Sequence, residues 1–108
     1  MADSLKVLGQ LDPAATTTTT LYTVPDKTQT TISSIVAANR TGSAITFRLS
    51  VHVAGAGADD KQFLFYDKSV AANDSFAIVI GITLNQEDVL KVHTSAVDMS
   101  FNVFGCER

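Results

Sequence analysis

Apolar and polar residues alternate strictly along residues 45–53, and this is the clearest pattern in the chain. The apolar positions are Ile45, Phe47, Leu49, Val51 and Val53. The polar positions between them are Thr46, Arg48, Ser50 and His52. Because successive side chains of a β-strand point to opposite faces, this pattern predicts a strand with one face on a core and the other in water. A helix would scatter the five apolar residues around its axis.

The segment before this strand, residues 29–39, carries Ile32, Ile35 and Val36 and predicts another strand. The residues between the two strands, 39–43, are typical of a tight turn, in which Gly42 suits a positive φ angle. We therefore expect a β-hairpin over residues 32–53.

Six further segments are predicted as strands, namely residues 5–11, 16–24, 61–66, 76–82, 89–94 and 99–104. The segment 76–82 is the most continuously apolar, so we expect it to be central and covered. Residues 67–69 are expected to form a turn, and residues 106–108 to follow the last strand irregularly.

About eight short strands separated by regular turn signals predict an all-β fold, an antiparallel β-sandwich with essentially no helix. The sequence leaves open whether the sandwich is Ig-like or a jelly roll. We expect one domain over residues 1–108, in which residues 1–11 form an N-terminal arm or an edge strand.

The composition agrees with this fold class and narrows the range of functions. Val, Ile and Thr supply about 30 positions, and these β-branched residues favour strands. The net charge is −3 without a basic stripe, so we expect no nucleic-acid partner. The lone Cys106 excludes an internal disulfide, and neither a signal peptide nor a membrane span is recognisable, which predicts a protein made in the cytoplasm.

Candidate reactive groups are few, and their spacing favours structural roles. His52 and His93 are the only histidines and are expected on the exposed side of strands, without a third metal ligand nearby. Cys106 lacks the basic surroundings of a reactive thiol. Asp59 and Asp60 in the glycine-rich loop 54–60 could gather a calcium ion together with Asp67 or Asp74, but their spacing matches no known calcium loop. We therefore expect no catalytic residue, metal or cofactor.

The segment 61–66 is unusual because aromatic residues stand on both of its faces. Phe63 and Phe65 are expected on one face, and Leu64 and Tyr66 on the other. Two apolar faces suggest that one packs against another molecule. The candidate interface residues are Leu64 and Tyr66, Leu21 and Tyr22 of the Thr-rich strand, and Leu5 and Val7 of the N-terminal strand.

Several motifs of the chain resemble those of small structural proteins of tailed bacteriophages. They are LGQLDPAATTTTTLYTVP, SSIVAANRTGSAITFRLSV, YDKSVAANDSFAIVIGITLNQEDVLKV and the terminal SFNVFGCE, which together cover nearly the whole chain. The resemblance implies a β-sandwich module of the virion, either a capsid decoration (cement) protein or a tail or fibre part, and brings no catalytic residues. It also implies virion localisation after synthesis in the host cytoplasm, with other virion proteins as partners. A homo-oligomer is expected, with a trimer favoured.

Two other function classes remain open. One is a carbohydrate- or receptor-binding module of a tail fibre, which would need Tyr22, Tyr66 or Phe63 exposed beside Asn and Asp groups. The other is a small enzyme, which would need a cluster of perturbed titratable groups in a cleft.

Overall fold

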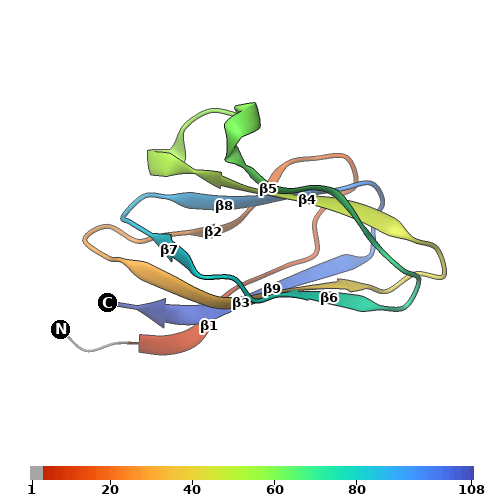
Figure 1. Cartoon of the computed structure of the whole chain (residues 1–108), viewed down its shortest axis with the longest axis horizontal. Coiled ribbons are helices and arrows are strands. Elements are labelled where there is room, and N and C mark those ends of the chain that lie inside the picture. The colour runs from red at the N-terminus through yellow and green to blue at the C-terminus, as the bar shows by residue number, and fades with distance from the viewer. Residues whose placement is uncertain (1–3) are drawn as a thin grey trace.

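Two antiparallel β-sheets face each other in the computed structural model, which describes residues 4–108 (Figure 1). The five-stranded sheet consists of β1 (Ser4–Leu11), β9 (Met99–Glu107), β3 (Thr30–Asn39), β6 (Ser75–Ile78) and β7 (Ile82–Leu84). The four-stranded sheet consists of β2 (Thr19–Thr23), β8 (Val89–Thr94), β4 (Ile45–His52) and β5 (Phe63–Val70). Two single 3₁₀ turns, η1 (Val53–Gly55) and η2 (Asp60–Gln62), lie between β4 and β5. The predicted all-β sandwich is confirmed.

The strand pairing identifies the sandwich as a jelly roll. The pairs β1–β9, β2–β8, β3 with β6 and β7, and β4–β5 nest inside one another along the chain, like one long hairpin. Pairing of β9 with β3 and of β8 with β4 then rolls this hairpin into two sheets. An Ig-like sandwich places its first and last strands in different sheets, whereas here β1 and β9 are neighbours.

The expected hairpin over residues 32–53 is wrong, because β3 and β4 belong to opposite sheets. The connection between them is an arch that Asn39 holds. Its side-chain amide donates to the carbonyl oxygens of Ser43 at 2.8 Å and Val70 at 3.1 Å, and its Oδ1 accepts from the Thr41 amide at 2.9 Å. Gly42 does not have the expected positive φ angle. Turn-forming residues serve a hairpin and an arch equally well, so sequence alone does not separate them.

The apolar segment 76–82 is split between two short strands, β6 and β7, which both pair with β3 at the edge of the sheet. Its expected central position is therefore also wrong. Ile78 and Ile82 are buried opposite Ile35 and Ile32 of β3. Between them the chain leaves β3, and Val79 and Ile80 are 74% and 47% exposed. This division gives nine strands between residues 4 and 108, where about eight were expected.

Several other boundaries differ from the prediction, among them the start of the strand expected over residues 61–66, which begins at Phe63 after η2. The strand expected from residue 16 starts at Thr19, because Thr16 adopts a φ of 53°. β5 continues through the expected turn at 67–69, where Asp67 adopts a φ of 53° in an irregularity of the β4–β5 pairing. β9 extends to Glu107, so residues 106 and 107 are part of a strand between two neighbours. β1 lies at the edge of its sheet, and residues 1–3 of the expected arm or edge strand over residues 1–11 lie outside the described part.

The core lies between the sheets and is centred on Phe47 of β4, whose ring stands 5.7 Å from that of Phe101 in β9. Ile45 and Leu49 are buried beside Phe47, as their alternation predicts. Gly9 of β1 allows the edges of the two sheets to meet, since a Cβ there would lie 2.6 Å from the Leu21 carbonyl oxygen of β2. The core therefore uses the inner faces and leaves both outer faces to other roles.

Candidate functional site

A polar network closes one end of the sandwich around Glu107. Its carboxylate accepts a hydrogen bond from the Tyr22 hydroxyl at 2.5 Å and lies 2.7 Å from the Lys6 ammonium. The Tyr22 oxygen also lies 2.8 Å from the Thr30 hydroxyl. The network joins β1, β9 and β3 of one sheet to β2 of the other. Its polar groups satisfy one another, so we assign it to stability.

The pKa values of this network follow from its contacts. Hydrogen bonds from Lys6 and then from Tyr22 lower the pKa of Glu107, because both stabilise the carboxylate. Burial, and next the bond to Glu107, raise the pKa of Tyr22 to about 12. The fold therefore favours a charged Glu107 and a neutral Tyr22, and the lowered pKa makes Glu107 a weaker proton acceptor than an ordinary glutamate.

The outer face of the four-stranded sheet carries an arginine–aromatic cluster. The Arg48 guanidinium lies 4.1 Å from the centre of the Tyr66 ring and contacts the Asp67 carboxylate at 2.7 and 3.3 Å. The rings of Phe63 and Tyr66 meet edge to face at 5.0 Å. The hydrogen bond between Arg48 and Asp67 lowers the pKa of the Asp67 carboxyl group and raises the pKa of the Arg48 guanidinium group. Since these charges are exposed, their pairing orients Tyr66 more than it stabilises the fold.

This cluster corrects the expected arrangement of the aromatic segment. Leu49 pairs with Phe65, but Ser50 pairs with Phe63, so Leu64 is an extra residue in β5. Phe65 consequently packs on the core, whereas Phe63 reaches the outer face beside Tyr66. Phe63 and Phe65 therefore do not share a face.

His52 is buried rather than exposed, and it anchors the loop between β4 and β5. The ring is 3% exposed, with Nδ1 2.9 Å from the Ala56 carbonyl oxygen and Nε2 2.9 Å from the Ser50 hydroxyl. A carbonyl oxygen can only accept, so Nδ1 donates, and in the neutral ring Nε2 accepts from Ser50. The loop carrying η1 and η2 lies on the outer side of the four-stranded sheet (Figure 1), and its Ala58 and Gln62 line one small pocket together with Ser50 and His52.

The Ser50–His52 pair was not found from the sequence, although two residues separated by one position share a face of a strand. The pair is buried, and its third partner is a carbonyl group rather than a carboxylate. A serine nucleophile must reach its substrate and needs donors for the developing oxyanion. The arrangement therefore fixes a loop. His93 lies nearby on β8, beside a small pocket of about 50 Å³ that Ser50 and His52 also line.

Three of the four aspartates considered for calcium have other partners. Asp59 caps η2 by accepting from the Lys61 amide, Asp67 binds Arg48, and Asp74 accepts from the Ser75 amide. Among residues 4–108 no group of three or more His, Cys, Asp or Glu side chains gathers in a way that could hold a metal ion. No helix of this part of the chain is long and apolar enough to cross a membrane.

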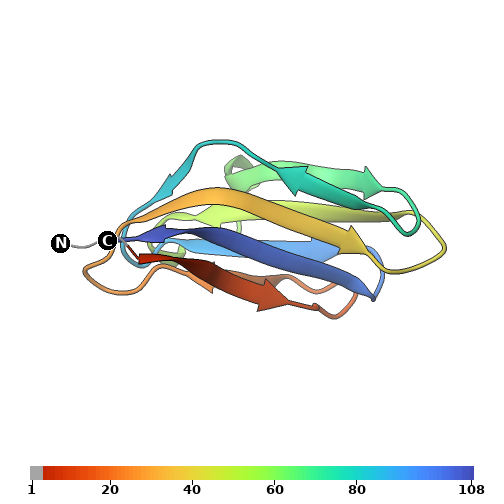
Figure 2. The same cartoon turned by 90° about the horizontal axis from the view of Figure 1, so that it is seen from below.

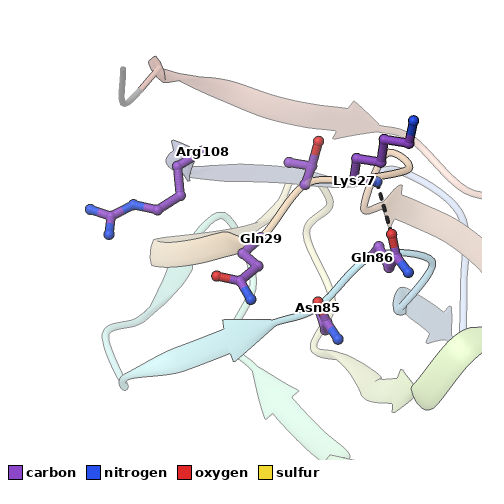
Figure 3. Close-up of a pocket in the computed structure, with 6 residues that line it drawn as sticks. Lys27, Gln29, Asn85, Gln86 and Arg108 are labelled. Carbon is purple, nitrogen blue, oxygen red and sulfur yellow. Dashed lines mark hydrogen bonds between the residues drawn. The ribbon is translucent and has the colours of Figure 1, made fainter. Parts of the chain in front are cut away.

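A shallow depression of about 390 Å³ lies at one end of the sandwich, and the polar residues Lys27, Thr28, Gln29, Asn85, Gln86 and Arg108 line it (Figure 3). The Lys27 amide donates to the Gln86 side chain at 2.9 Å. Figure 3 shows the Lys27 and Arg108 side chains pointing in different directions. Because the two cationic groups do not converge on one point, the depression lacks the geometry of a binding site for an anion.

The six candidate interface residues separate into two groups. Leu5, Val7, Leu64 and Tyr66 are exposed, by 84%, 49%, 42% and 60%. Leu21 and Tyr22 are each only 7% exposed and belong to the core, because their strand turns these side chains toward the other sheet. Leu21 and Tyr22 are therefore not available to a partner on the surface.

Comparison with known proteins gives a likeness in structure alone. No protein-family model matches the chain, and no curated protein matches its sequence. A chain in the structure of infectious bursal disease virus, Gx strain, matches 98% of this chain with 11% identity and a TM-score of 0.55. A chain of the T13 IBDV viral particle matches 97% of it with 10% identity and a TM-score of 0.52. This chain spans 32% and 30% of those chains, and identities this low establish only a shared fold.

The Glu107 network predicts a pH dependence of stability. Because the pKa of Glu107 is lowered in the fold, its stabilisation is present above the ordinary pKa of about 4.3 and is lost as the pH falls through the folded value. We expect Glu107→Gln to lower the free energy of unfolding at pH 7 by about 1–3 kcal/mol and to reduce its acid dependence below about pH 5. Urea unfolding at several pH values measures both.

The control is Glu87→Gln, which changes the chain's other glutamate at an exposed position. It should alter neither the stability at pH 7 nor the pH dependence. Identical pH profiles for Glu107→Gln and the unmodified protein would contradict the assigned role of Glu107.

Proposed function

We propose that this protein is a non-enzymatic structural component of a virion, acting through contacts with other virion proteins. The observation that carries the proposal is the likeness of nearly the whole chain to parts of chains from an icosahedral virus. The jelly roll is a common fold of capsid proteins. Its two sheets pack on one shared hydrophobic core, which leaves the outer faces and the loops available for contacts with other proteins.

The distribution of side chains supports a role in assembly. The perturbed titratable groups, Tyr22, Arg48, Asp67 and Glu107, pair with one another in two networks on different sides of the molecule. Catalysis needs such groups gathered in one cleft around a substrate. Exposed apolar residues, in contrast, stand on several strands and loops and are available to protein partners.

The kind of virion and the position on it rest on the sequence motifs. Their resemblance to structural proteins of tailed bacteriophages favours a capsid decoration (cement) protein or a tail-accessory module. Virion proteins are arranged around symmetry axes, where the same surface of each copy meets the next copy. We therefore propose that copies of this module associate with one another, with a trimer favoured.

The test is the location of the chain on purified phage particles. We expect it to co-sediment with virions of the phage that encodes it, at a fixed copy number that is a multiple of three. Separation of heads from tails, followed by quantitative mass spectrometry, distinguishes a decoration protein from a tail module. Virions that lack the chain entirely would exclude the proposed function.

A second candidate function is recognition of a host carbohydrate or receptor by a tail fibre. The observation that favours it is Tyr66, which is 60% exposed on the outer face, next to Asp67 and stacked on Arg48. An exposed aromatic ring beside hydrogen-bonding groups is suited to an amphipathic ligand. Tyr22, the other tyrosine, is buried and does not meet this requirement.

A glycan array with the purified chain tests this second function. If a glycan binds, Tyr66→Ala should weaken it at least about tenfold, equivalent to ~1.4 kcal/mol, because the ring would supply the stacking surface. Leu64→Ala is the matched control, since Leu64 is exposed on the same strand without joining the cluster. Absence of binding to any glycan, or equal binding by both variants, would count against carbohydrate recognition.

A further inference from the structure

Charge is distributed very unevenly between the two sheets. The strands of the five-stranded sheet contain two charged residues, Lys6 and Glu107, which bind each other at 2.7 Å at one end of the sheet. Both point toward the inner side, where Glu107 meets Tyr22 of the opposite sheet. The outer face of this sheet therefore presents no Asp, Glu, Lys, Arg or His from any of its strands. We call this surface the uncharged face (Figure 2).

Apolar and small residues make up the uncharged face. Strand register and burial place these apolar side chains on it: Leu5, Val7, Val36, Ala38, Ala77 and Phe104. Small polar residues fill the rest, and the Gln10 amide is satisfied by Asn102 at 2.7 Å. A mostly apolar depression of about 410 Å³ lies over β1, β9 and β3. Leu5, Val7 and Phe104 line it, and so does Lys6, whose ammonium group pairs with Glu107. The buried cores of protein–protein interfaces are likewise depleted of charged residues.

The outer face of the other sheet has a different character. It carries Arg48, Asp67 and His93, and the loop with η1 and η2 covers part of it. The chain as a whole holds 19 charged residues with a net charge of −3. A partner of the uncharged face must bury its own surface without leaving charges unpaired, and a second copy of this face meets that condition.

The size of the uncharged face also fits an interface. Four strand widths of about 4.8 Å and about eight residues at ~3.3 Å each give roughly 500 Å² per copy. Two copies would bury roughly 1,000 Å², which is the lower end for specific interfaces. We therefore expect a contact of micromolar rather than nanomolar strength.

We propose that the uncharged face is the contact surface between copies of this chain. The inference rests on the proposed function and deepens it, because it names the surface through which copies of the virion module associate. If two uncharged faces meet, the contact is isologous and gives a dimer. If the face receives a different edge of the next copy, such as the exposed Val79 and Ile80, the contact is heterologous, and it forms a trimer when the rotation between copies is one third of a turn.

The test introduces one charge on the uncharged face. Val7→Lys places an ammonium group on β1, at one edge of the uncharged face, whereas Val97→Lys makes the same change in the loop before β9 at almost equal exposure, 49% against 52%. Ala77→Lys is a second variant, at an exposed position on the far side of the same face. Circular dichroism and thermal unfolding establish that each variant folds.

Light scattering during size exclusion measures molar mass from about 1 to 500 µM, the range of a weak specific interface. We expect the unmodified protein and Val97→Lys to form a dimer or trimer as the concentration rises, and Val7→Lys and Ala77→Lys to stay monomeric or associate at least tenfold more weakly. A monomer at every concentration would overturn the inference, as would association that both face variants retain.

The failure of this inference is separable from the failure of the proposed function. A chain that is bound to virions but monomeric in solution, and whose Val7→Lys variant binds particles normally, would remove the contact between copies and leave the virion role intact. A chain that associates through the uncharged face but is absent from virions would do the reverse.

Discussion

The position of β9 between β1 and β3 is the constraint on which the rest of the structure depends. Pairing of β9 with β1 closes the nested hairpin, and pairing of β9 with β3 rolls that hairpin into two sheets. Both features therefore require β9 at this position. Alternation along β9 then divides its side chains. Phe101 and Val103 fill the core, while Phe104 and Cys106 line a depression on the opposite side.

The same strand links the fold to the surfaces proposed for function. Glu107 ends it and draws Tyr22 of the other sheet and Lys6 of β1 into one network. The two charges in the strands of the five-stranded sheet thereby pair with each other on its inner side, and the strands place none on its outer face. Pairing of the two charges at the end of the sheet and exposure of an uncharged sheet face thus arise from one arrangement of residues.

The sequence predicted the local structure well and the partners of each strand poorly. The alternation over residues 45–53 identified β4 and its core residues, because alternation records which side of a strand is buried. It did not reveal the sheet to which a strand belongs, so the arch at Asn39 looked like a hairpin turn and the edge segment 76–82 looked central. Burial of His52 and Ser50 was missed for a similar reason, since a loop covers them from outside the sheet. Leu21 and Tyr22 were expected at an interface but belong to the core, because an apolar residue on a strand can be buried either by the chain itself or by a partner.

The most direct measurement for the central claim is the reaction rate of Cys106 with a maleimide at low and high protein concentration. Cys106 is the chain's single cysteine and lines the depression on the uncharged face, so its labelling reports on that surface alone. If copies cover this face, labelling is markedly slower at about 500 µM protein than at about 1 µM, and the Val7→Lys variant removes the difference. Equal labelling rates at the two concentrations would contradict the account.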